Sequence, residues 1–294
     1  MRLLSVNVGT VRRGPRQAGL TAIDKRPVDG PVLITAPAPE VTAAVGLAGD
    51  EVGDRWHHGG PDQAAYAYAR EDLDMWQGEL NAPLRNGMFG ENLATAGMDV
   101  NGALIGERWR VGAEAIVEVS CPRIPCHTFQ QWLGQADWIR RFTQAARPGT
   151  YLRVIREGQI RAGDPMEIVY RPRHEVTVAL VFRALTLEPD LLPRLLAAEA
   201  LPEETRELAH RRTALPQRAR SRTSSRSPRV NGAGLPCMLL DLRALAAISS
   251  ACCGPMPTAA RQGTASRPRV SRIQARPSPM DAAGWPVSSC ATSV

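Results

Sequence analysis

The chain has 294 residues, which is enough for one large domain or two and for a substantial core. Its formal net charge of +7 is uneven: eleven arginines and two acidic residues follow Pro216, so this segment carries +9 and the preceding residues −2. The charge therefore argues against a nucleic-acid footprint on the folded part, and no segment approaches the length of a membrane span.

The number of cysteines indicates the cellular compartment. Cys121 and Cys126 are the two cysteines before the basic segment, which is too few for a disulfide framework. The first eight residues include Ser5 and Asn7 and are too short and polar for the core of a signal peptide. We therefore expect a cytoplasmic protein that does not enter the membrane.

The first sixty residues predict short strands and loops. Residues 3–8 alternate apolar and polar side chains, as a strand does, and residues 20–34 contain two more strand candidates. Asp29-Gly30 is the predicted hairpin turn between those two. Lys25 is the only lysine of the chain, and we attribute the preference for arginine elsewhere to the coding bias of the source.

The segment His58-Gly59-Gly60-Pro61-Asp62 is incompatible with regular structure. Its glycines allow positive φ, let the backbone approach a ligand, and can present amides to an anion. An ordinary surface turn with a stray histidine is the simpler local interpretation. Beyond it, residues 65–69 alternate alanine and tyrosine and predict a strand with both tyrosines on one face. Arg70 ends that strand, and a helix is predicted over 71–80.

A second glycine-rich segment spans residues 86–93 and contains Glu91 and Asn92. One carboxylate and one amide beside flexible backbone suit a site that orients a polar ring. The alternative is that both side chains cap a turn. A strand and turn are predicted over 104–112 and a further strand over 115–119.

Two prolines interrupt the chain after that strand and bracket Arg123. Cys126 follows on this stiff turn, where Arg123 and the adjacent His127 favour its thiolate form. A buried, inert cysteine is the common alternative. A zinc site using Cys121, Cys126 and His127 has the wrong spacing for a CxxC pair, and the body of the chain offers no second ligand pair.

The remaining elements complete the fold prediction. One helix or two short ones are predicted over 128–146, and strands over 151–156 and 166–170. Many short strands with glycine turns and a few inserted helices predict a mainly β protein built on a β-barrel. Three short helices are predicted after a linker at 171–173.

Three segments, in this order, are similar to the MOSC family, the domain shared with molybdenum cofactor sulfurases: His58-Gly59-Gly60-Pro61-Asp62-Gln63-Ala64, Phe89-Gly90-Glu91-Asn92-Leu93 and Pro122-Arg123-Ile124-Pro125-Cys126. Residues 3–9 and 25–30 resemble its YiiM-like branch. The resemblance covers roughly residues 1–213. It implies a MOSC-type barrel over 1–170 and a three-helix module over 174–213. Composition predicts a disordered tail rich in Arg, Ser, Pro and Ala over 216–294, which we also consider as an unselected reading of a GC-rich frame.

The resemblance also implies a site. Cys126 is then the catalytic residue and the molybdenum ligand, because molybdenum selects a soft thiolate. The implied molybdopterin-binding residues are His58, Gly59, Gly60, Asp62, Arg70, Glu91, Asn92 and Arg123.

The implied reaction is the two-electron reduction of a small N-hydroxylated compound, such as 6-hydroxylaminopurine, to the amine. Because no GxGxxG fingerprint follows a strand, we expect the electrons to come from a separate, flavin-containing reductase. We expect no nucleic-acid partner, since the basic tail lacks interleaved aromatic residues. The alternatives are a persulfide carrier and a non-catalytic molybdopterin-binding protein.

Overall fold

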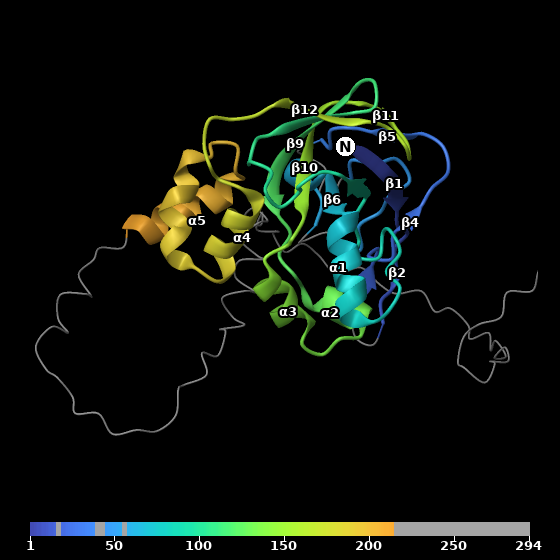
Figure 1. The fold of residues 1–294 in the computed structure, drawn as a ribbon, viewed down its shortest axis with the longest axis horizontal. Coiled ribbons are helices and arrows are strands. Elements are labelled where there is room, and N and C mark those ends of the chain that lie inside the picture. The colour runs from blue at the N-terminus through green and yellow to red at the C-terminus, as the bar shows by residue number, and fades with distance from the viewer. Residues whose placement is uncertain (16–18, 39–44, 55–57, 215–294) are drawn as a thin grey trace, which may run out of the picture. The chain divides into compact units, whose positions relative to one another are not determined.

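The computed structural model describes residues 1–15, 19–38, 45–54 and 58–214. The predicted disordered tail, 216–294, lies outside the described residues. Over these residues the architecture is a β-barrel with inserted helices, followed by three short helices (Figure 1). None of the described helices is both long and apolar enough to cross a membrane.

The main sheet contains eight of the described strands in the order β12-β8-β9-β10-β6-β7-β1-β4. Their bounds are Arg2–Val8 (β1), Arg26–Pro27 (β4), Ala65–Ala69 (β6), Leu93–Ala96 (β7), Arg108–Val111 (β8), Ala115–Pro122 (β9), Thr150–Arg156 (β10) and Met166–Tyr170 (β12). Two small ribbons pair Arg12–Arg13 (β2) with Leu20–Thr21 (β3), and Val32–Ile34 (β5) with Gly158–Ile160 (β11).

The main sheet closes on itself between β1 and the start of β12. The backbone N–H of Leu3 donates to the carbonyl of Asp164 (2.9 Å), and that of Met166 donates to the carbonyl of Met1 (3.0 Å). Arg2 forms a bridge with Pro165 between these bonds. Closure pairs the start of β12, which would be an exposed edge in an open sheet of this order. The expected barrel is therefore present.

One sequence prediction about pairing is wrong. The two short strands around Asp29-Gly30 are not a hairpin, because β4 pairs with β1 and β5 pairs with β11. Gly30 does adopt a positive φ of 83°, as the turn chemistry requires, but the turn sends the chain to a different ribbon. The strands β7 and β11 were also missed, since each is only a few residues long.

Strand β6 separates two hydrophobic clusters, because successive side chains of a strand point to opposite faces. Its alanines, 65, 67 and 69, belong to a large aliphatic cluster inside the barrel. Tyr66 and Tyr68 share the other face, as predicted, and join an aromatic cluster that includes Trp76, Phe89 and Trp138. In that cluster the rings of Trp76 and Trp138 lie 4.7 Å apart and meet edge to face.

Helices at one end of the barrel carry several further members of this aromatic cluster. They are α1 (Arg70–Leu80), α2 (His127–Leu133) and α3 (Trp138–Ala145), with a single 3₁₀ turn, η1 (Pro61–Gln63), before β6. Figure 1 shows α1, α2 and α3 gathered below the strands. The region expected to hold one helix or two short ones holds two, because Gly134 ends α2 in the left-handed conformation (φ 67°).

The three helices after the barrel are α4 (Val178–Thr186), the 3₁₀ helix η2 (Pro189–Ala197) and α5 (Glu203–Ala214). Thr177 caps α4 by accepting a hydrogen bond from the backbone N–H of Leu180 (3.1 Å). Val181 and Leu195 are fully buried and belong to the same aliphatic cluster as the barrel interior. The three-helix segment is thus packed on the barrel through apolar side chains.

Candidate functional site

The turn after β9 fixes the position of Cys126. β9 continues to Pro122, which pairs with Thr150 of β10, so the strand is longer than the sequence predicted. Pro125 then restricts the backbone, and Cys126 is extended (φ −117°, ψ 168°) as the N-cap of α2. Its side chain is half-buried and lines a cavity at this end of the barrel. The thiol therefore has a fixed direction and access to a ligand.

The surroundings of Cys126 favour its thiolate. Burial raises the pKa of the Cys126 thiol, but a hydrogen bond from His58 and the charge of Arg123 outweigh it and lower the pKa to about 7. The backbone N–H of Phe129, in the first turn of α2, acts in the same direction. At neutral pH a large share of the sulfur is therefore anionic, which is the form that binds soft metals or attacks electrophiles.

Arg123 is a buried cation beside this sulfur. Its guanidinium donates to the carbonyl of Phe89 and lies 4.1 Å from the ring centroid of Phe129 and 5.0 Å from that of Tyr66. Burial alone would lower the pKa of Arg123, but the neighbouring Tyr66, Tyr151 and Cys126 raise it. Aromatic faces and acceptors thus hold a positive charge in a site with little solvent.

The loop before β6 brings His58 to the cavity. Gly59 and Gly60 have φ of 92° and 88°, conformations that favour glycine, so the predicted positive φ is confirmed. His58 and Gly59 line the cavity, together with Gln63 at the end of η1. The Oε1 atom of Gln63 is buried and has no hydrogen-bond partner among the described residues. The loop therefore supplies a thiolate partner and an unused acceptor.

The turn before β7 is organised by Glu91. Its carboxylate is fully buried and accepts hydrogen bonds from the backbone N–H groups of Gly87 (2.5 Å) and Phe89 (3.0 Å). Burial raises the pKa of Glu91 to about 7 although these bonds act against it. Glu91 shapes the turn from behind, while Gly90 and Asn92 line the cavity. Glu91 therefore caps the turn, which is the alternative that the sequence left open for this side chain.

Sequence reasoning missed a buried ion pair that lines the same cavity. Lys25 Nζ donates to both carboxylate oxygens of Asp50, and Asp50 also accepts from Asn92 Nδ2 (2.8 Å) and from the backbone N–H of Gly9 (2.8 Å). Burial lowers the pKa of Lys25, and the charge of Asp50 opposes that shift. The one available signal was that Lys25 is the only lysine in a chain that otherwise uses arginine.

The cavity encloses about 740 Å³ of empty space, a value that includes open solvent at its mouth. Five predicted site residues line it, and they come from three separate segments of the chain: His58, Gly59, Asn92, Arg123 and Cys126. The lining unites them with Lys25 and Asp50, and with the aromatic rings of Tyr66 and Tyr151. The fold therefore gathers cations, a thiol and aromatic faces around one space.

Four predicted site residues do not line the cavity. Glu91 and Gly60 lie in the turns that shape it. Asp62 is paired with Arg153 of β10, and its carbonyl accepts from Ser120 Oγ (2.6 Å). Arg70 begins α1 rather than ending β6, and it donates to Asp74, to the carbonyl of Leu84 and to Asn86. Asp62 and Arg70 thus connect elements of the fold in this structure.

The zinc alternative receives no support over the described residues, where no group of three or more His, Cys, Asp or Glu side chains is arranged to hold a metal. Cys121 is buried within β9, and His127 is exposed. Of these two cysteines, Cys126 is the one that lines the cavity.

The cavity fits an anionic pterin–metal group on three observations. It offers one soft anionic sulfur, the buried cation Arg123 beside the Lys25–Asp50 ion pair, and an unused acceptor on Gln63. Aromatic rings of Tyr66 and Tyr151 supply flat apolar surface. A thiolate for the metal, cations for a phosphate and polar groups for a ring are the donor types that such a group requires.

Comparison with known proteins gives consistent results. A model of the MOSC domain matches residues 54–167, which contain both glycine-rich segments and Cys126. The protein YiiM of Escherichia coli (strain K12) is 34% identical over 203 residues, covering 65% of this chain and 84% of YiiM. A protein named reductase from Gibberella moniliformis is 31% identical over 188 residues, which cover 62% of this chain but 32% of the length of that protein. The crystal structure of YiiM from Geobacillus stearothermophilus is similar at a TM-score of 0.59 and 27% identity, over 72% of this chain and 99% of that one.

Proposed function

The chain belongs to the MOSC domain family, and from this membership we propose that it is a molybdopterin-dependent oxidoreductase that reduces N-hydroxylated small molecules to amines. The observation that carries the proposal is Cys126, a half-buried thiol with a pKa of about 7 at the edge of a cavity lined by buried cations. The name of the Gibberella relative, reductase, also supports an oxidoreductase.

The proposed roles follow from position. Cys126 would provide the protein ligand to molybdenum, and the bound molybdenum centre would supply two-electron redox chemistry that amino-acid side chains lack. Arg123 would neutralise the anionic groups of the cofactor, and Gln63 would hydrogen-bond its ring. Asn92 would hold the cavity wall, because its amide binds Tyr66, Asn7 and Asp50. His58 would hold the sulfur in its anionic form. Asp62 and Arg70 are left outside this set, because they do not line the cavity.

The proposed reaction is R–NHOH + 2 e⁻ + 2 H⁺ → R–NH₂ + H₂O. The N–O bond breaks, the oxygen leaves as water, and solvent at the open mouth provides the protons. The electrons come from a separate flavoprotein. Flat nitrogen heterocycles such as 6-hydroxylaminopurine suit a cavity whose lining includes Tyr66 and Tyr151.

The decisive experiment is metal and pterin analysis of protein produced in a host that makes molybdopterin. The wild-type protein should contain about one molybdenum and one pterin per chain and should reduce 6-hydroxylaminopurine with reduced viologen as donor. Cys126→Ala should abolish molybdenum loading and turnover, whereas the matched variant Cys121→Ala should retain both. Full loading of Cys126→Ala would overturn the ligand assignment.

The same low-pKa thiol also suits a persulfide carrier, which is the second candidate function. That function requires a cysteine-bound sulfane sulfur and no metal. Mass spectrometry of protein incubated with a cysteine desulfurase and cysteine would detect a gain of one sulfur atom on Cys126. A protein that gains this sulfur and binds no molybdenum contradicts the reductase proposal. A protein that binds molybdopterin and shows no turnover is a carrier instead.

A further inference from the structure

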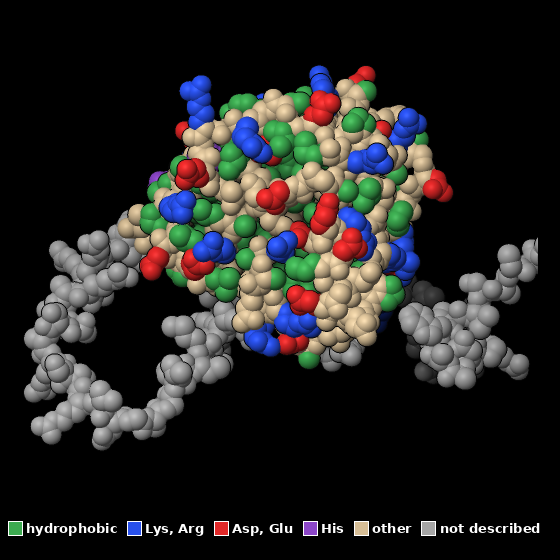
Figure 2. Space-filling view, in the orientation of Figure 1, with side chains coloured by type: hydrophobic (Ala, Val, Ile, Leu, Met, Phe, Trp, Pro, Cys, Tyr) green, Lys and Arg blue, Asp and Glu red, His purple; other side chains and the backbone are tan. Residues whose placement is uncertain are grey.

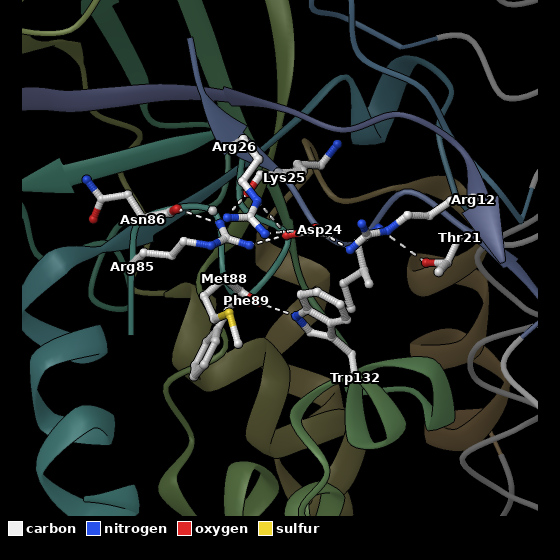
Figure 3. A network of polar contacts seen from close by, with 12 residues as sticks. Arg12, Thr21, Asp24, Lys25, Arg26, Arg85, Asn86, Met88, Phe89 and Trp132 are labelled. Atoms are coloured by element: carbon white, nitrogen blue, oxygen red, sulfur yellow. Dashed lines mark hydrogen bonds and ion pairs between the residues drawn. The ribbon is translucent and has the colours of Figure 1, made fainter. Parts of the chain in front are cut away.

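An arginine cluster lies on the outer side of the cavity wall. The carboxylate of Asp24 receives the guanidinium groups of Arg12, Arg26 and Arg85, as Figure 3 shows. Asp24 itself is nearly buried, with 6% of its side chain exposed, whereas the side chains of Arg12 and Arg26 are 50% and 62% exposed. Three cations therefore share one anion, and two of them face solvent.

This cluster borders the mouth of the cavity. Ile23 and Lys25 line the cavity, and Asp24 lies between them in a tight turn in which the backbone N–H of Lys25 donates to the carbonyl of Ile23 (2.9 Å). In the β2–β3 ribbon, Arg13 pairs with Leu20, which is 57% exposed and also lines the cavity. The Arg12 guanidinium lies 5.5 Å from the ring centroid of Trp132 on α2. We call Arg12, Arg13, Arg26 and Arg85, together with Leu20, the arginine face.

The arginine face differs from other surface arginines described in the structure. Arg110, Arg140 and Arg183 each pair with one acidic side chain, Glu167, Asp137 and Glu188 respectively. Figure 2 shows basic and acidic side chains intermixed over much of the visible face, with blue side chains along the edge where β4 and β2 lie. Since the residues before Pro216 carry a net charge of −2, this local positive excess is not a property of the whole fold.

We propose that the arginine face docks an acidic surface of the flavoprotein that delivers electrons to the cavity, an inference that rests on the proposed reductase function. Electron transfer slows steeply with distance, so the donor has to bind beside the mouth. A positive surface with one exposed apolar side chain, Leu20, suits an acidic protein partner and accelerates its association. A nucleic acid is disfavoured because the aromatic ring of Trp132 is already stacked against Arg12.

The test is charge reversal at two exposed positions of the arginine face, in the double variant Arg13→Glu/Arg26→Glu. The change removes the ion pair between Arg26 and Asp24, and Arg12 and Arg85 remain to bind Asp24. The matched control is Arg161→Glu, an exposed arginine paired with Asp164 that does not line the cavity. The probe is a flavodoxin, an acidic flavin protein, measured for direct binding by surface plasmon resonance and as electron donor in turnover.

The wild-type protein should bind the flavodoxin, and the affinity should fall as salt is added. The double variant should lose about tenfold or more in affinity and in kcat/KM for the flavodoxin, whereas turnover with reduced viologen and the Arg161→Glu control should stay within about twofold. Equal affinity of wild type and double variant overturns the proposal. An equal fall of both donor activities also overturns it, since the cluster then only supports the cavity wall. If the protein binds single-stranded DNA more tightly than flavodoxin, the proposal is also overturned, because the arginine face then binds a nucleic acid.

Failure of the proposed function gives a different pattern. A wild-type protein that holds no molybdenum and shows no turnover with viologen refutes the reductase proposal. The binding measurement does not depend on turnover. If the salt-dependent flavodoxin affinity is still lost in the double variant, the arginine face remains a docking surface for an acidic flavin protein.

Discussion

The cavity wall buries Lys25, Asp50, Glu91 and Arg123, whereas the helices after Thr177 bury apolar side chains, with Thr205 as the buried polar residue among those described there. Arginines in the helical segment stay at the surface, as the Arg183–Glu188 pair does. Burying charge costs free energy unless each group is paired, and burying aliphatic side chains stabilises the fold directly. The helical segment therefore stabilises the fold, whereas the buried charges around the cavity cost part of that stability.

The largest expected effect comes from breaking the buried ion pair. Asp50→Ala leaves Lys25 buried beside Arg123 without its anion and should lower the free energy of unfolding by roughly 3–5 kcal/mol, measured in urea. Lys25→Met is the matched variant. It should cost less, because Asp50 keeps its hydrogen bonds from Asn92 and from the backbone of Gly9. An equal or greater loss for Lys25→Met contradicts this asymmetry.

The next largest effect comes from removing a buried apolar side chain in the helical segment. Leu195 is fully buried in the aliphatic cluster, so Leu195→Ala should cost roughly 2–5 kcal/mol of unfolding free energy through the cavity it creates. Leu187→Ala, at a side chain that is 37% exposed, is the control and should cost much less. The folded fraction of Leu195→Ala should bind molybdopterin like the wild type. A specific loss of binding would show that the two regions are not independent.

A smaller effect depends on pH. Burial raises the pKa of Glu91 from 4.5 to about 7, so the folded state favours the protonated carboxyl. The stability contributed by this group is therefore fully present below about pH 4.5 and is lost as the pH rises to about 7. Relative to Glu91→Gln, the wild type should lose roughly 1–3 kcal/mol across this window. Parallel urea-denaturation profiles for the two proteins would contradict the shift.

The smallest of these effects concerns the thiol itself. His58→Ala removes a hydrogen bond that stabilises the Cys126 thiolate and should move the pKa of the thiol up from about 7. Alkylation of Cys126 by iodoacetamide in cofactor-free protein, followed by mass spectrometry of its peptide, should slow by roughly threefold to tenfold at neutral pH. His127→Ala, at the exposed neighbouring histidine, is the control and should change little. An unchanged pH profile in His58→Ala removes the histidine from this role.

Much of the candidate site could be predicted because three contiguous segments resemble the MOSC family. His58-Gly59, Asn92, Arg123 and Cys126 were taken from that resemblance, whereas local composition alone favoured a surface turn and an inert cysteine, and all of them line one cavity. Lys25 and Asp50 were missed, because an ion pair between residues 25 apart leaves no local pattern. Arg70 was misplaced for the same reason: its position before a helix was visible in the sequence, but its partners Leu84 and Asn86 were not.

The sequence by itself determined the elements whose periodicity is complete within a few residues: the strand at 65–69, the helix of which 71–80 was predicted, and the strand at 166–170. Local alternation and helix spacing suffice there, because the burial of one face follows from the pattern. Tertiary structure alone decided that β4 pairs with β1 instead of β5, and that Leu3 meets Asp164 to close the barrel. It also decided that Lys25 and Asp50 line the same cavity as Asn92 and Cys126. Backbone hydrogen-bond partners and buried counter-charges are supplied by segments far away in the chain, so no local stretch of sequence specifies them.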